Sequence, residues 1–301
     1  MAFRTVEISG PAEIHINKGQ MEVTKEDGTF LIALEDIETL ICSSAGIRMS
    51  TMAMSQIASS GISMMVINEK YHPSCISLPF ESNVRQSLVL REQIALTEEE
   101  KYDIWTDVVR RKIENQAGAL TLLGSEGSEA ILKYTSGFDA ETIDLFEAKA
   151  AKAYFQYLHP GLNRRLEDPV NSSLNYGYAV LRNAVIRAIV LSGFQPSIGL
   201  HHNNQFNSFN LADDLIEPWR PFVDVIAVKD PGSSLILGRK RRKALASVLY
   251  HACSINGVKM SVSNGIGEMV ASIRRILVNK DDTKIKLPLL LPIEVLDPVN
   301  E

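Results

Sequence analysis

One glutamate lies where a helix would turn it towards apolar neighbours. At about 100° per residue, the face that holds Glu147 also carries Ile143, Ala150 and Tyr154, so one carboxylate interrupts an apolar stripe. An unpaired carboxylate is costly to bury, so this side chain must be neutralised, pair with a cation or bind a metal ion. The alternative is a rotated helix in which Glu147 reaches water at the edge of the stripe.

A second group of acids and imidazoles follows further along the chain. His201 and His202 end an apolar stretch, and Asp213 and Asp214 precede Glu217 at spacings that share one helical face. Carboxylates with one imidazole suit a hard divalent ion such as Mg²⁺ or Mn²⁺, whereas zinc more usually takes several His or Cys ligands. The alternative is that the aspartates are charges at a helix N-terminus that complement the helix dipole.

Basic residues accompany these candidate ligands. A cationic run from Arg239 to Lys243 follows Gly238 at an expected helix start, and further arginines lie in the same half of the chain. Arginine, lysine and amide side chains together are typical of phosphate contacts, which favours a phosphodiester substrate. The alternative is an ordinary solvated helix face. The candidates for DNA contact are Arg164, Arg165, Arg220, Arg239, Lys240, Arg241, Arg242 and Lys243.

The charge of the chain is divided unevenly. All 301 residues together carry a formal charge of −5, which argues against a polycation that binds nucleic acid by bulk charge. Residues 1–150 hold 13 basic and 23 acidic side chains, a net of −10, whereas residues 151–301 hold 18 and 13, a net of +5. We therefore expect the two halves to do different work, with nucleic acid at the second half.

Several other classes of protein lack support in the sequence. Cys42, Cys75 and Cys253 are odd in number and far apart, which favours a reducing, cytoplasmic compartment over a disulfide framework. No apolar run reaches the roughly 18 residues of a membrane span, so we expect a soluble protein without a membrane partner. The motifs of nucleotide triphosphatases, dinucleotide-binding proteins, esterases and zincins are absent.

The elements that must position these residues fall into two parts. Short alternating runs with a hairpin signal at Asp27-Gly28 predict β structure at the start of the chain, interrupted by a helix over residues 51–59. Later the period becomes helical, and Thr97 to Glu100 form a capping box. Further helices are expected over residues 140–158, 172–191, 238–253 and 266–278.

We therefore predict an α+β fold. A small N-terminal β-rich domain over residues 1–85 is followed by a larger, all-α domain over residues 86–301, which holds the candidate metal site.

Three blocks of residues carry a family resemblance. They run from Phe146 to Phe155, from Asp168 to Tyr178, and from His202 through Asp214 to Pro221. In this order, the blocks resemble the signatures of the CRISPR-associated integrases, the "Cas one" family. The stretch from Asn204 to Asn210 is similar to the members that accompany single-protein, type II effector nucleases.

The resemblance implies which residues form the metal site. Matched by motif position, Glu147, His202 and Glu217 are the implied catalytic residues and ligands of Mg²⁺ or Mn²⁺, with the adjacent His201 as the alternative imidazole. The candidate supporting residues around them are Asp214, His201, Tyr154 and Asn207.

The resemblance also implies an activity. Such an enzyme inserts new spacer DNA into the CRISPR array of a prokaryotic cell, in the cytoplasm. A 3′-hydroxyl attacks a phosphodiester bond, and this transesterification needs no external energy source, which agrees with the missing nucleotide-binding loop. The alternatives are a metal-dependent, structure-specific nuclease acting on branched DNA and a non-catalytic DNA-binding scaffold.

The implied partners follow from the same family. They are double-stranded DNA, as spacer precursor and as CRISPR repeat, a second copy of the chain, and the small "Cas two" protein. The type II effector nuclease machinery is a further candidate. The β-rich domain would dimerise and dock the small partner, and the helical domain would bind metal and DNA.

Overall fold

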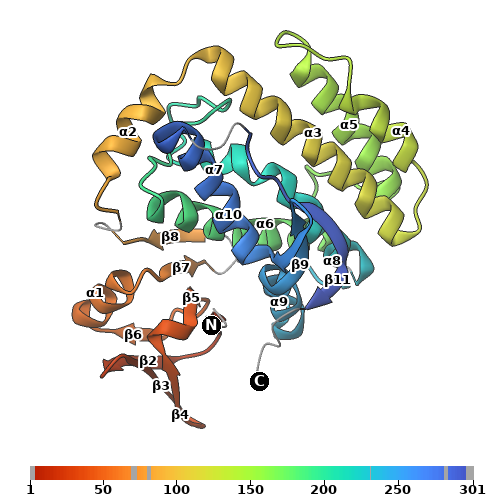
Figure 1. Cartoon of the computed structure of the whole chain (residues 1–301). Coiled ribbons are helices and arrows are strands. Elements are labelled where there is room, and N and C mark those ends of the chain that lie inside the picture. The colour runs from red at the N-terminus through yellow and green to blue at the C-terminus, as the bar shows by residue number, and fades with distance from the viewer. Residues whose placement is uncertain (1–3, 69–72, 80–82, 231, 281–283, 296–301) are drawn as a thin grey trace.

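The computed structural model describes residues 4–68, 73–79, 83–230, 232–280 and 284–295. It confirms the predicted α+β fold, because strands dominate the first part of the described chain and helices dominate the second (Figure 1). Among the described helices, none is long and apolar enough to cross a membrane.

The first sheet faces the helical part of the molecule. Its strand order is β1-β5-β7-β8, in which β1, β5 and β7 run parallel and β8 runs antiparallel to β7. The central strand β5 is buried along its whole length, as expected for a parallel strand with both faces covered. The bounds are β1 Arg4–Ile8, β5 Ile37–Cys42, β7 Ser63–Ile67 and β8 Pro73–Ser77.

The second sheet has its own small core. The order is β4-β3-β2-β6, and the predicted hairpin joins β3 to β4 through a turn at Glu26 and Asp27, with Gly28 as the first residue of β4. The predicted helix α1, Thr51–Ser59, is confirmed, with the Ser50 side chain accepting from the Ala53 amide at 3.1 Å as its N-cap. The remaining bounds are β2 Ala12–Asn17, β3 Gln20–Lys25, β4 Gly28–Ala33, η1 Leu34–Asp36 and β6 Ile47–Met49.

Helices carry most of the second part. The predicted capping box opens the 26-residue α3: the Thr97 amide donates to Glu100 at 2.9 Å, and the Glu100 amide donates to Thr97 at 3.2 Å. The bounds are α2 Gln86–Ala95, α3 Glu98–Leu123, α4 Ser128–Leu132, η2 Lys133–Thr135, α5 Ile143–Leu158, α6 Pro169–Leu191, α7 Asn210–Leu215, η3 Glu217–Trp219, α8 Arg220–Lys229, α9 Arg239–Ala246, η4 Ser247–Tyr250, α10 Val262–Arg274 and η5 Arg275–Asn279.

A three-stranded antiparallel sheet corrects the prediction of an all-α second domain. Its order is β10-β9-β11, with bounds β9 His251–Ile255, β10 Val258–Ser261 and β11 Leu289–Val295. Of the helix expected over residues 238–253, only Arg239–Ala246 is α-helical, and residues from His251 onward belong to β9. The physical reason is the Asn256-Gly257 turn between β9 and β10, whose residues both have positive φ, 50° and 79°. Such a turn favours a hairpin.

The two parts share packing across the predicted domain boundary. Ile41 and Met65 of the first sheet belong to the same buried cluster as the helices. Helix α6 adds polar links to that sheet, because Arg187 pairs with Glu38 at 2.7 Å and the Asn183 amide donates to Ser63 at 2.8 Å. The division at residues 85 and 86 therefore marks a change in secondary structure, and it stays a prediction as a domain boundary.

Candidate active site

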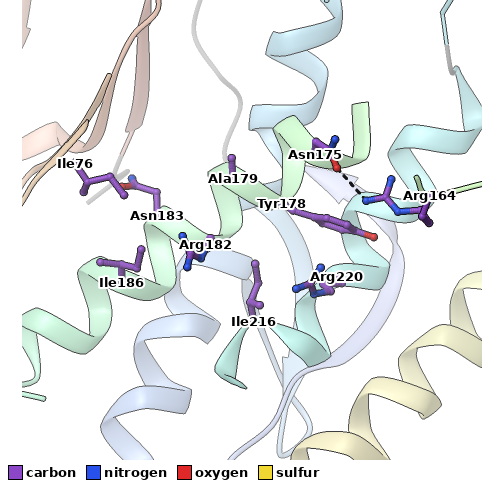
Figure 2. Close-up of a pocket in the computed structure, with 10 residues that line it drawn as sticks. All are labelled: Ile76, Arg164, Asn175, Tyr178, Ala179, Arg182, Asn183, Ile186, Ile216 and Arg220. Carbon is purple, nitrogen blue, oxygen red and sulfur yellow. Dashed lines mark hydrogen bonds between the residues drawn. The ribbon is translucent and has the colours of Figure 1, made fainter. Parts of the chain in front are cut away.

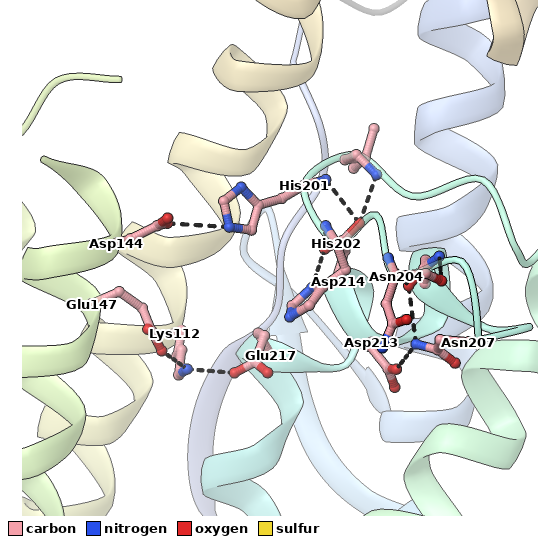
Figure 3. Close-up of polar contacts among 12 residues, drawn as sticks. Lys112, Asp144, Glu147, His201, His202, Asn204, Asn207, Asp213, Asp214 and Glu217 are labelled. Atoms are coloured by element: carbon pink, nitrogen blue, oxygen red, sulfur yellow. Dashed lines mark hydrogen bonds and ion pairs between the residues drawn. The ribbon is translucent and has the colours of Figure 1, made fainter. Parts of the chain in front are cut away.

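A buried lysine joins two of the three predicted metal ligands. Lys112 of α3 contacts Glu147 of α5, and its Nζ lies 2.5 Å from Glu217 Oε2 in η3 (Figure 3). Lys112 is 8% exposed and Glu217 is 7% exposed. We call these three residues the acid–lysine cluster. Glu147 has a cation as its partner, as one prediction had it, and its side chain is also 27% exposed, so it lies at the edge of the apolar stripe as the alternative had it.

Local structure explains how Glu217 reaches this cluster. Pro218 has no backbone N–H to donate to a helical hydrogen bond. The chain therefore forms the short 3₁₀ turn η3 between α7 and α8. The Asn115 side chain of α3 donates to the Pro218 carbonyl at 2.8 Å and fixes the turn against α3. The turn thereby holds the Glu217 side chain in contact with Lys112.

The charges of the cluster stabilise one another. Burial alone would raise the pKa of Glu217, but Arg220 and Lys112 outweigh burial and hold this pKa below its usual value. Burial would likewise lower the pKa of Lys112, yet the Glu217 and Glu147 carboxylates raise it. Arg220 Nε lies 3.0 Å from Glu217 Oε1. Glu217 is therefore a carboxylate that remains ionised although it is buried.

Asp214 fixes the loop that carries the predicted imidazole ligand. This fully buried carboxylate accepts the amides of Leu200 at 2.6 Å, His201 at 3.1 Å and His202 at 3.0 Å. Its Oδ1 also lies 2.6 Å from Nδ1 of His202, and this hydrogen bond raises the pKa of His202. A metal-binding histidine is commonly oriented through its other ring nitrogen in this way, which leaves Nε2 for the ion.

The loop tolerates no side chain at Gly199. A Cβ there would lie 2.3 Å from the His202 carbonyl oxygen and 2.8 Å from Asp214 Oδ2. The close approach of Gly199 to Asp214 is therefore part of what positions His202.

The two adjacent histidines have different surroundings. His201 stacks on Trp105 of α3 with ring centroids 4.5 Å apart and 3° between the planes, and its Nε2 lies 3.1 Å from Asp144. His202 instead takes Asp214 as its partner, and Glu217 is near enough to add to the rise of its pKa. Of the two imidazoles, His202 is thus the one oriented by a buried acid beside the acid–lysine cluster.

Tyr154 belongs to a different cluster from the one predicted for it. Its hydroxyl donates to Asp224 Oδ2 at 2.8 Å, and the Tyr178 hydroxyl donates to the other oxygen of the same carboxylate. Burial raises the pKa of Asp224 to about 6, although the two phenol hydrogen bonds oppose that rise. We call these three residues the tyrosine–aspartate cluster.

Asn207 fixes the loop that precedes α7 to the first turn of that helix. Its side chain donates to Asp213 at 2.7 Å and to Asn210 at 3.1 Å. Asp213 also pairs with Arg182 of α6, at 2.6 Å and 3.0 Å. Asp213 lies in the first turn of α7, as the alternative of a charge at a helix N-terminus predicted. It also has a specific cationic partner in Arg182.

The predicted metal ligands are not gathered around one point. Among the residues that the structure describes, no three His, Cys, Asp or Glu side chains form a group that could hold a metal ion. Lys112 lies between Glu147 and Glu217. The donor set still fits a hard cation, because two carboxylates from separate elements converge on one positive charge beside an oriented imidazole. The metal site remains a prediction.

The predicted DNA-binding residues divide by exposure. Arg242 is 6% exposed and pairs with Glu7 at 2.6 Å, so its guanidinium faces the protein interior rather than DNA. Arg241 donates to Ser173 at 3.1 Å, and its exposure is intermediate. Arg164 donates to Asn175 of α6, and Arg220 pairs with Glu217 of η3. The exposed members are Arg165, Arg239, Lys240 and Lys243.

Lys112 and Trp105 are the site residues that sequence reasoning missed. Lys112 lies among buried Val108, Val109 and Ile113 on α3, so it is a lone charge in an apolar stripe. That signal is the same as the one that identified Glu147. Nothing comparable marks Trp105, because aromatic residues at helical spacing are ordinary core residues.

Comparison with known proteins identifies similar chains. Residues 7–230 match the family described as "CRISPR associated protein Cas1". The chain is 31% identical to the CRISPR-associated endonuclease Cas1 of Neisseria meningitidis serogroup C (strain 8013), over 98% of each chain.

Solved structures share the fold at low sequence identity. A casposase bound to its integration product matches with a TM-score of 0.77 at 16% identity, covering 100% of this chain and 96% of that one. A Cas1 protein from Thermotoga maritima matches with a TM-score of 0.75 at 15% identity, covering 94% and 99%. A chain of a Cas6-RT-Cas1–Cas2 complex matches with 0.72 at 16% identity, covering 95% of this chain and 36% of that one.

Proposed function

The chain belongs to the Cas1 family of CRISPR-associated proteins, and from that premise we propose that it is a metal-dependent DNA endonuclease and integrase. It would insert new spacer DNA into a CRISPR array. The observation that carries the proposal is the convergence of Glu147 and Glu217 on one buried cation, beside an imidazole oriented by Asp214.

The reaction is a transesterification. The oxygen of a DNA 3′-hydroxyl forms a bond to the phosphorus at the border of the repeat and loses its proton, while the bond from that phosphorus to the 3′-oxygen of the flanking strand breaks. The departing oxygen takes up a proton, so the number of phosphodiester bonds is unchanged. No nucleotide triphosphate is consumed.

The residues of the chain would divide this work. Glu147, His202 and Glu217 would hold Mg²⁺ or Mn²⁺, which when bound would polarise the scissile phosphate and stabilise the leaving oxygen. Arg220, paired with Glu217 at 3.0 Å, would neutralise phosphate charge. Asp214 would keep the His202 ring in place throughout.

The partners belong to the same proposal. We infer double-stranded DNA as substrate, because the similar casposase was solved with its integration product. A second copy of the chain and the small Cas2 protein are proposed partners, and a similar chain was solved in a complex that includes Cas2. The stretch from Asn204 to Asn210 supports an association with type II machinery in the prokaryotic cytoplasm.

The two adjacent histidines offer a matched test. Purified protein is incubated with labelled linear DNA, a plasmid that carries the repeat, Cas2 and Mn²⁺, and covalent joining of the label to the plasmid is measured. We expect His202→Ala to reduce joining by about 100-fold or more, because the lost ligand acts on the transition state. His201→Ala should retain joining to within about tenfold.

Each other outcome has a definite meaning. Joining by His202→Ala together with loss in His201→Ala would transfer the ligand role to His201. Cleavage of branched DNA without joining by the unmodified protein would favour the structure-specific nuclease. DNA binding without joining or cleavage would favour the non-catalytic scaffold. Thermal unfolding of both variants controls for loss of fold.

A further inference from the structure

A buried glutamine of α2 holds the start of the loop that carries His202. Gln93 is 3% exposed. Its Nε2 donates to the carbonyl oxygens of Gln195 at 3.0 Å and Ile198 at 2.8 Å, and its Oε1 accepts the Gln195 amide at 2.9 Å. Both donors and the acceptor of the side-chain amide are therefore used. They fix its orientation, because a flipped amide would place like groups against each other.

Gln93 is a polar residue on the buried side of α2. Val89 and Gln93 are the buried residues of this helix, and their spacing places them on one face. A buried amide is costly unless it is hydrogen-bonded, and packing alone would be served by an apolar side chain. The partners of this amide are the two ends of one tight turn, in which the Ile198 amide donates to the Gln195 carbonyl at 3.2 Å. Gln93 therefore fixes that turn as a unit.

The turn leads directly to the contacts of His202. Ile198 is followed by Gly199, which has no room for a Cβ beside Asp214 and the His202 carbonyl. Leu200 comes next, and its amide donates to Asp214 at 2.6 Å. A shift of the turn would therefore disturb the close approach of Gly199 to Asp214 and the hydrogen bonds that orient His202.

Three helices hold this loop at successive points. Gln93 of α2 holds its start, and Asp214 of α7 holds its centre (Figure 3). Its far end is held from α6, because Arg182 (Figure 2) donates to Asn207 at 3.3 Å. Helix α7 continues from the loop itself, whereas α2 and α6 contact it from other parts of the chain. These two helices therefore help to fix the loop relative to the acid–lysine cluster.

We propose that Gln93 is a positioning residue for His202. Its amide sets the turn, the turn sets the approach of Gly199 to Asp214, and that approach sets the imidazole beside the acid–lysine cluster. This inference rests on the proposed function in one respect, because the ligand role of His202 belongs to it. The alternative is that Gln93 only attaches α2 to the rest of the protein.

Asn83 offers a matched control for that alternative. Its side chain lies just before α2 and donates to the carbonyl of Leu191, the last residue of α6, at 3.0 Å. Gln93→Met and Asn83→Leu each replace an amide by an apolar group of similar shape, and Gln93 is the one of the two that contacts the loop. If Gln93 only attaches α2, both variants should behave alike.

Hydrogen exchange in metal-free buffer measures the loop itself. We expect Gln93→Met to speed exchange of the three amides bonded to Asp214 about tenfold, and Asn83→Leu to change it by less than about twofold. Gln93→Asn keeps the amide on a side chain too short to span the turn, so its effect should be intermediate. Thermal unfolding identifies loss of fold in Gln93→Met, and Gln93→Asn then carries the test.

Binding of Mn²⁺ tests the consequence for His202. Free Mn²⁺ is measured by its electron paramagnetic resonance signal in titrations of the full-length protein. Gln93→Met should raise the apparent Kd about tenfold, and Asn83→Leu should change it by less than about twofold. Strand joining by Gln93→Met should recover at saturating Mn²⁺ to within about threefold, because every proposed ligand is retained. A general loss of fold would not be restored in this way.

Three results would overturn the inference. The first is unchanged exchange of the loop amides in Gln93→Met. The second is faster exchange with an unchanged Kd for Mn²⁺, which would leave Gln93 as an attachment of α2. The third is the same pair of changes in Asn83→Leu. If the unmodified protein neither binds Mn²⁺ nor joins strands, but the Gln93 variants alone speed loop exchange, the proposed function is rejected and the turn stays assigned to Gln93.

Discussion

Two buried carboxylates seven residues apart have opposite surroundings. Glu217 belongs to the acid–lysine cluster and is 7% exposed, whereas Asp224 belongs to the tyrosine–aspartate cluster and is 1% exposed. The cations Arg220 and Lys112 outweigh burial and lower the pKa of Glu217. Burial dominates at Asp224 and raises its pKa to about 6.

The difference lies in the kind of partner that each carboxylate has. Lys112 gives Glu217 a full positive charge, which a metal ion could replace. Tyr154 and Tyr178 give Asp224 two neutral hydrogen-bond donors, and the more distant charges of Arg220 and Arg164 do not offset its burial. Glu217 therefore depends on a positive charge to stay ionised, whereas the buried Asp224 is stabilised by hydrogen bonds.

Replacing Lys112 should give the largest change in stability, because it removes the cation that distinguishes Glu217 from Asp224. Lys112→Met leaves the buried Glu217 and the half-buried Glu147 without their shared cation, so we expect it to lower the free energy of unfolding by about 3–5 kcal/mol in metal-free buffer. Mn²⁺ should then raise the melting temperature of this variant more than that of the unmodified protein, because no ammonium has to be displaced.

The control for the lysine variant is Lys259→Met. That lysine pairs at the surface with Glu294, and both side chains are about half exposed, so little change is expected. Equal responses of both variants to Mn²⁺ in thermal unfolding would count against a cation site at Glu147 and Glu217.

The pH dependence of stability should have opposite signs for the two acids. The pKa of Asp224 rises from 3.8 to about 6 on folding, so its contribution is present below pH 3.8 and is lost as the pH rises through about 6. This loss is about 3 kcal/mol. The pKa of Glu217 falls on folding, so its contribution is present above pH 4.5 and is lost as the pH falls.

Urea unfolding between pH 3 and pH 7 in metal-free buffer measures both effects. The stability difference between the unmodified protein and Asp224→Asn should shrink as the pH rises. The difference from Glu217→Gln should instead grow as the pH rises to about 4.5 and stay level above it. Parallel curves for the two variants would show that the two acids do not differ in this way.

A single phenol gives the smallest expected effect. Tyr154→Phe removes one hydrogen bond to Asp224 and keeps the ring in the core, so we expect a loss of about 1–2 kcal/mol in the free energy of unfolding. Strand joining should be retained, because the hydroxyl faces Asp224 and not the acid–lysine cluster. A large loss of joining at unchanged stability would return Tyr154 to the predicted set of supporting residues.

The sequence was sufficient for the local features of the fold and the site. The capping box at Thr97, the helix over residues 51–59 and the hairpin at Asp27-Gly28 each depend on neighbouring residues, and the structure confirms them. Helical period alone places Glu147 in an apolar stripe, and the structure gives this half-buried acid Lys112 as its cation.

The features that sequence reasoning missed depend on distant partners. Tyr154 turns to Asp224, which is 70 residues away, and Arg242 is buried against Glu7, which is 235 residues away. Helical period gives the face of a residue but not the element that covers it. The Asn256-Gly257 turn is a local signal for the third sheet, but the helical pattern before it predicts a longer helix.

The packing of α6 against the first sheet has a consequence for synthesis of the chain. The last strand of that sheet ends at Ser77, but the helix that covers Ile41 and Met65 ends at Leu191. At ~5–20 residues per second, a ribosome needs on the order of 5–25 s to cover that interval. During this time the apolar face of the sheet is finished and uncovered, so the nascent chain has to be kept from aggregating until its central helix emerges.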